Sequence, residues 1–88
     1  MADSIKPSTY FGLLAEFGKA HIPVTEIGAK YFDHDDKTAK RYARDAKYPF
    51  PVFRAGNNAS TWMVDAVVFA DYLDKVKEKA RAEYKAAK

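Results

Sequence analysis

The sequence predicts a mainly α-helical domain with a small β-hairpin, arranged as a winged helix-turn-helix. Residues 37–47 repeat cations at helical spacing on one face and apolar residues on the other, directly after a short second helix and an acidic turn. Two short β-favouring runs separated by a polar loop follow, which is the pattern of a hairpin, or wing.

Length and charge distribution favour a binding module. A chain of 88 residues forms one domain, which is too small to enclose an active site between domains. Residues 37–54 carry six Lys and Arg against one Asp, whereas residues 1–36 carry three Lys against six Asp and Glu. Positive charge concentrated in one stretch is typical of a nucleic-acid contact surface.

Several classes of protein are not expected. The absence of cysteine removes disulfides and zinc fingers, and it favours an intracellular, cytoplasmic location. No apolar run approaches the roughly 18 to 20 residues of a membrane span, so no membrane partner is expected. The chain has no Ser/His/Asp motif and no Gly-rich phosphate loop, so we expect no enzyme, no catalytic residues and no cofactor.

The first part of the chain predicts an arm and two helices. Residues 1–8 are expected to form a flexible arm, and Ser8 or Thr9 caps a first helix that ends at Gly18. Residues 22–24 are expected to be extended because of the proline, and Thr25 caps a second short helix through residue 32. Gly28 weakens that helix but permits close packing.

The basic helix is expected to span about residues 36–47. Asp35 or Asp36 can cap its start, and the proline at position 49 stops it. Its apolar side is expected to pack on the first and last helices through contacts among Tyr42, Phe17 and Phe69.

The remaining segments predict the wing and a long helix. The hairpin strands are residues 52–54 and 62–64, joined by a loop rich in turn residues. Asp65 is expected to cap a helix whose apolar side docks on the body as far as residue 76. We therefore expect a DNA-binding domain over residues 9–76 and a charged helical extension over residues 77–88.

The candidate DNA-binding residues follow from these positions. At least one of Arg41 and Arg44 is expected to contact a base edge, and the neighbouring lysines are expected to contact phosphates. The full set on the helix is Lys37, Thr38, Lys40, Arg41, Arg44 and Lys47, and on the wing Arg54, Asn57 and Asn58. A lone basic stripe is more often a solvated face, but the capped turn before it and the hairpin after it favour double-stranded DNA. No metal site is expected, because consecutive acidic residues beside His34 are ordinary helix caps.

Several short runs together resemble the pyocin activator family of small phage and prophage regulators. The most specific is Pro-Phe-Pro-Val-Phe-Arg at residues 49–54. The others are Phe-Gly-Leu-Leu-Ala-Glu-Phe-Gly at 11–18, Ile-Pro at 22–23, Tyr-Phe at 31–32, Lys-Thr-Ala-Lys-Arg at 37–41 and Ala-Asp-Tyr-Leu-Asp at 70–74. This resemblance, over about residues 9–75, implies a transcription activator that binds DNA near promoters of phage-derived genes.

Two other functions remain open from the sequence. The order of helix, wing and helix also resembles phage excisionases, which bend DNA and direct site-specific recombination. A protein-interaction adaptor without DNA contact is the alternative of another class. For a DNA-binding role we expect self-association on DNA as a dimer or array, and contact with the transcription or recombination machinery.

Overall fold

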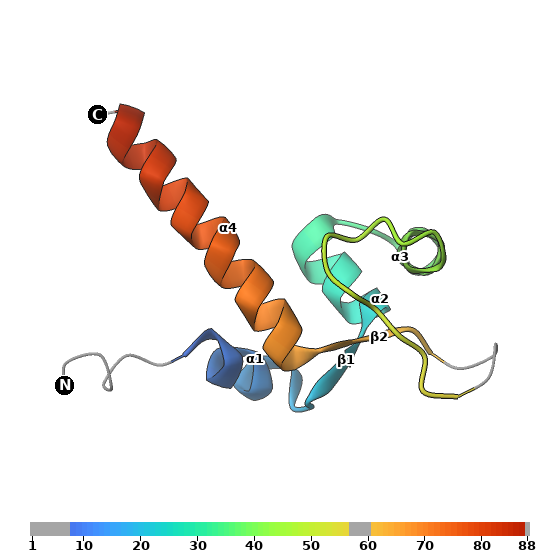
Figure 1. Ribbon diagram of the computed structural model, residues 1–88. Coiled ribbons are helices and arrows are strands. Elements are labelled where there is room, and N and C mark those ends of the chain that lie inside the picture. The colour runs from blue at the N-terminus through green and yellow to red at the C-terminus, as the bar shows by residue number, and fades with distance from the viewer. Residues whose placement is uncertain (1–7, 57–60, 88) are drawn as a thin grey trace.

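The computed structural model describes residues 8–56 and 61–87 and confirms the expected fold class. It is mainly helical with a two-stranded antiparallel sheet, in a layout consistent with a winged helix-turn-helix (Figure 1). The elements are α1 (Thr9–Phe17), β1 (His21–Pro23), α2 (Val24–Ile27), the π-helix η2 (Gly28–Phe32), α3 (Asp36–Arg44), β2 (Met63–Asp65) and α4 (Ala66–Ala87).

Local caps define three helix ends, two of α1 and one of α4, as the sequence predicts. The Ser8 hydroxyl accepts a hydrogen bond from the Phe11 N–H at 3.1 Å and begins α1. Gly18 ends α1 in the left-handed conformation, with φ of 70°. The Asp65 carboxylate accepts a hydrogen bond from the Val67 N–H at 2.8 Å at the start of α4. Each cap satisfies backbone groups that the helix itself leaves unpaired.

The second helix begins two residues earlier than predicted. Thr25 does not cap it, because Val24 is already helical and Pro23 occupies the cap position without a side-chain hydrogen bond. The Val24 N–H instead donates to the carbonyl oxygen of Trp62 at 3.0 Å. The first N–H group of α2 is thus satisfied by a backbone carbonyl of the wing, and no side chain caps the helix.

The sheet pairs segments that the sequence did not predict as partners. β1 and β2 are antiparallel, with Ile22 opposite Val64, and both of these side chains are fully buried. The expected partner, residues 52–54, contributes one bridge, in which Phe53 and Met63 exchange two hydrogen bonds of 2.9 and 2.8 Å. β2 therefore lies between β1 and the Phe53 bridge, and it ties the wing to the segment before α2.

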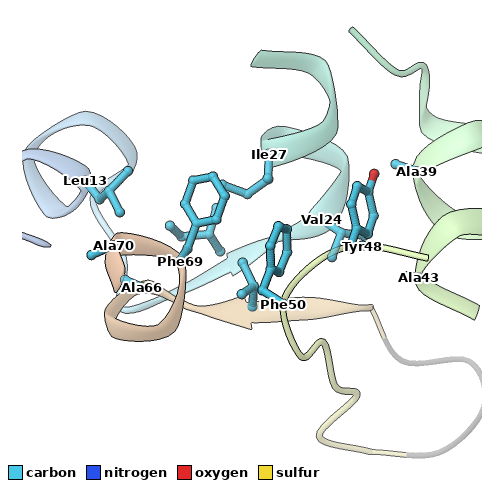
Figure 2. Packing of buried hydrophobic residues seen from close by; sticks show 12 residues of the cluster. Leu13, Val24, Ile27, Ala39, Ala43, Tyr48, Phe50, Ala66, Phe69 and Ala70 are labelled. Atoms are coloured by element: carbon cyan, nitrogen blue, oxygen red, sulfur yellow. The ribbon is translucent and has the colours of Figure 1, made fainter. Parts of the chain in front are cut away.

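The core forms where the first half of α4 meets α1, α2 and the sheet. Phe69 is fully buried, and its ring lies 5.2 Å from that of Phe50 (Figure 2). The Phe69 ring also lies 5.1 Å from that of Tyr31. The expected contact of Tyr42 with Phe17 and Phe69 is wrong. The Tyr42 ring packs instead on His34 and Tyr48, with centroids 4.4 and 5.5 Å away.

The molecule is elongated because α4 is longer than the body that it packs against. Its radius of gyration is 14.8 Å, whereas a compact domain of this length has about 12 Å. The second half of α4 projects away from the other elements (Figure 1). Within the described ranges, no helix combines the length and the apolar character that a membrane crossing requires.

Candidate nucleic-acid interface

The turn before α3 sets the start of the basic helix. The Asp35 carboxylate accepts a hydrogen bond from the Thr38 N–H at 2.8 Å. The sequence offered either Asp35 or Asp36 as the cap of this helix, and the structure shows that it is Asp35. Hydrogen bonding from Thr38 lowers the pKa of Asp35 below its ordinary value, and the nearby charges of Arg41 and Lys37 lower it further. The carboxylate therefore stays ionised beside the positive end of the helix dipole.

The two faces of α3 differ in burial as the spacing predicts. Ala39 and Ala43 are 0% and 2% exposed and pack toward α2 and η2. Thr38 and Tyr42 are half-buried at the edges of this face. The exposed cations of the helix are Lys37, Lys40, Arg41 and Arg44. One side of the helix is held by the body while its charged side meets solvent.

Few carboxylates neutralise these cations. Within the ranges that the structure describes, Lys37, Lys40 and Arg41 have no carboxylate within 4.0 Å. The Arg44 guanidinium lies 3.4 Å from the Asp45 carboxylate. This is a long contact between two exposed side chains, and such an ion pair contributes little free energy in water. The surface is therefore suited to attract an anionic ligand.

The helix ends at Arg44, three residues before the predicted end. Ala46 adopts the left-handed conformation with φ of 53°, and its N–H donates to the Ala43 carbonyl. The Lys47 N–H donates to the Tyr42 carbonyl at 2.9 Å, which completes a Schellman motif. Alanine gives no sequence signal for this ending, because glycine is the usual residue there.

Lys47 follows the end of α3 but lies close to the Tyr42 side chain of that helix. Its Nζ lies 5.8 Å from the centre of the Tyr42 ring, within reach of a cation–π contact. The structure thus places Lys37, Lys40, Arg41 and Arg44 on α3 itself and Lys47 just beyond its end.

The support beneath α3 comes from residues that the sequence did not identify as part of the site. The Tyr48 ring is buried between Ala39 and Phe50 (Figure 2), and burial raises the pKa of its hydroxyl. That hydroxyl is 3.0 Å from Nδ1 of His34, in a hydrogen bond. The His34 ring also packs on the rings of Phe32, Tyr42 and Tyr48. Among the described residues, no group of three His, Cys, Asp or Glu could hold a metal ion.

The base of the wing lies on the Trp62 side chain. The Arg54 guanidinium is 4.4 Å from the centre of the Trp62 ring, and both side chains are half-buried. Trp62 is itself tied to the start of α2 by its carbonyl oxygen. Asn57 and Asn58 lie outside the described residues. Of the three predicted wing residues, Arg54 is therefore the one that the structure positions.

Comparison with known proteins identifies the family. Residues 9–80 match the family described as Pyocin activator protein PrtN. The chain belongs to the pyocin activator family. No curated protein and no solved structure matched the chain.

The pyocin activator family is a family of phage-type transcription activators and not a family of enzymes. The match extends from α1 through α3, the wing segment and β2 into α4. It ends at residue 80, before the last part of α4.

Proposed function

We propose that this pyocin activator family member binds double-stranded DNA and activates transcription of phage- or prophage-type genes, with α3 in the major groove. The observation that carries the proposal is the arrangement of α3, in which two buried alanines fix the helix while four cations face solvent. An α-helix fits the major groove, and Lys and Arg on its outer face supply phosphate and base contacts.

The cations have different roles in this proposal. Arg41 and Arg44 lie about one helical turn apart, and at least one of them contacts a base edge, since a guanidinium can bind guanine with two hydrogen bonds. Lys37, Lys40 and Lys47 contact phosphates, and Thr38 near the helix start contacts a base edge or a phosphate.

The wing adds contacts to the backbone or the minor groove through Arg54, Asn57 and Asn58. Stacking on Trp62 limits the conformations of Arg54 before DNA arrives, so less entropy is lost on binding. We assign residues 9–76 to the DNA-binding unit and residues 77–88 to an extension. Of the arm expected over residues 1–8, residues 1–7 lie outside the described residues, and Ser8 caps α1. As an activator the bound protein would also contact the transcription machinery.

DNA affinity over a salt series tests the proposal. The Arg41→Ala/Arg44→Ala double variant should bind duplex DNA at least about tenfold more weakly than the parent, because each base or phosphate contact of this kind contributes roughly 1 to 3 kcal/mol. Lys75→Ala/Lys79→Ala removes the same charge from an exposed part of α4 and is the matched control. Equal affinity of the parent and the α3 double variant, with both folded by circular dichroism, would refute the proposed interface.

Genome-wide mapping of bound sites separates the remaining roles. An activator should occupy promoters, whereas an excisionase-like factor should occupy recombination attachment sites. An adaptor should show no salt-dependent DNA binding, because only a protein that neutralises phosphates releases counterions. Family membership favours the first outcome.

A further inference from the structure

The proposed recognition helix α3 is held on the body by a shallow contact. Its fully buried side chains are Ala39 and Ala43, which pack toward α2 and η2 through single methyl groups. Side chains of this size form low ridges, and low ridges do little to prevent one helix from rotating on another. The rotation of α3 about its own axis therefore depends on larger side chains at the edge of the buried face.

Tyr42 is the one aromatic side chain of α3, and it lies half-buried at that edge. Helical spacing places it about 80° around the axis from the midpoint between the two buried alanines. A contact to the side of a helix opposes rotation more effectively than a contact directly beneath it. The Tyr42 ring makes such a contact with the His34 ring, and the two ring centroids are 4.4 Å apart.

His34 joins α3 to the parts of the body on either side of it. Its backbone N–H donates to the Gly28 carbonyl oxygen at 2.9 Å, which fixes the residue to η2. Its Nδ1 lies 3.0 Å from the Tyr48 hydroxyl, in a hydrogen bond between the turn before α3 and the segment after it. Because Tyr48 is buried in the core, the half-buried His34 ring rests on a fixed support.

We propose that His34 is a positioning residue for DNA recognition, which acts through Tyr42 to set the rotation of α3. This inference rests on the proposed function of α3. A rotation of about 20° moves the outer end of a side chain by about 2 Å, for a helix radius of about 5 to 6 Å. Hydrogen bonds to base edges tolerate a range of only about half an ångström, whereas a flexible lysine can follow a phosphate. Loss of the His34 contacts should therefore reduce sequence discrimination more than affinity for DNA in general.

The rotation of α3 can be measured in the free protein, without DNA. Residual dipolar couplings of backbone N–H groups vary periodically along a helix, and the phase of this variation reports rotation about the helix axis. In His34→Ala the couplings of α3 should depart from the parent orientation, while those of α1 and α4 should still fit it. Couplings of α3 that fit the parent orientation in this variant would overturn the proposal.

Leu73→Ala is the control for a general loss of packing. It removes a half-buried side chain from α4 that packs on the core, and Leu73 has no contact with the rings beneath α3. The couplings of α3 should fit the parent orientation in this variant. Circular dichroism should show that both variants are folded, and an equal change of α3 in both would also overturn the proposal.

Two DNA duplexes separate sequence discrimination from affinity. One is selected by the parent protein from a random-sequence pool, and the other is a shuffled duplex of the same base composition. His34→Ala should lower the ratio of the two affinities at least about fivefold, which is the effect of losing one base contact. Its salt slope should stay at the parent value because the phosphate contacts remain.

The outcomes distinguish this inference from the proposed function. An unchanged affinity ratio in His34→Ala, or an equal fall in Leu73→Ala, would overturn the role of His34 in discrimination. A parent that selects no sequence would refute the proposed function itself. The dipolar couplings would then still decide whether His34 sets the rotation of α3.

Tyr48→Phe tests the hydrogen bond while the buried ring stays in place. It should change the couplings of α3 and the affinity ratio in the same direction as His34→Ala. Tyr31→Phe is the matched control, since its hydroxyl lies 3.3 Å from the Glu16 carboxylate of α1 and should not affect α3. In the double variant His34→Ala/Tyr48→Phe, the fall in the ratio should be smaller than the product of the two single effects, because both changes remove one connection. Multiplying effects would overturn the proposed connection through Tyr48.

Discussion

Gly28 of η2 and Ala39 of α3 meet so closely that a methyl group on Gly28 would lie 3.0 Å from the Ala39 Cβ. The same methyl group would lie 3.0 Å from the Tyr48 hydroxyl. The contact brings the backbone of η2 directly against the recognition helix that we propose. The position of α3 on the body therefore depends on the absence of a side chain at residue 28.

Gly28→Ala should lower the free energy of unfolding by about 1 to 3 kcal/mol, because the added methyl group overpacks a rigid contact. Gly12→Ala is the control, since a Cβ at this exposed helical position meets no atom within 4 Å and should stabilise by roughly 0.4 to 1 kcal/mol. Urea unfolding measures both variants. A Gly28→Ala protein as stable as the parent would contradict the close contact.

Asp35 should make stability depend on pH at the acidic end. Its pKa is lowered in the folded protein, so its contribution is fully present above the ordinary aspartate pKa and is lost as the pH falls through the lowered value. Asp35→Asn keeps an amide oxygen that can cap α3 but cannot titrate.

Thermal unfolding of the parent and the Asp35→Asn variant between about pH 2 and pH 7 should therefore show a smaller acid-induced loss for the variant. Asp71→Asn, on exposed α4, is the control for general charge effects. Identical pH profiles for parent and Asp35→Asn would show that the cap has no lowered pKa.

Tyr42→Ala should destabilise the protein by about 2 kcal/mol, because the half-buried ring packs on His34 and Tyr48. Tyr42→Phe keeps the ring and should be nearly neutral. Because Lys47 lies over this ring, Tyr42→Ala should also weaken DNA binding more than Tyr42→Phe does. A fully neutral Tyr42→Ala variant would show that the ring does not support α3.

Lys37→Ala and Arg41→Ala should have different effects on DNA affinity and sequence preference when binding is measured over a range of salt concentrations. Lys37→Ala should weaken all sequences alike and reduce the salt slope by about one unit, because it removes one phosphate contact. Arg41→Ala should also reduce discrimination between sequences if Arg41 contacts a base edge. Equal loss on specific and unrelated DNA for both variants would assign Arg41 to the phosphate backbone.

The sequence by itself determined the interactions between residues that lie close together along the chain. Ser8, Gly18 and Asp65 mark helix ends because a cap bonds to groups one to four residues away. Helical spacing likewise separates the cations of α3 from the buried Ala39 and Ala43, so the candidate binding face could be predicted from its periodicity alone.

Only the tertiary structure decided how these elements meet. β2 pairs with β1 some forty residues away, and the Trp62 carbonyl, rather than Thr25, accepts the hydrogen bond that starts α2. The left-handed turn at Ala46 ends α3 early, and Tyr42 packs on His34 and Tyr48 instead of the first and last helices. Propensity describes single residues and their neighbours, whereas strand pairing, close contacts and aromatic clusters depend on which surfaces bury the most apolar area together.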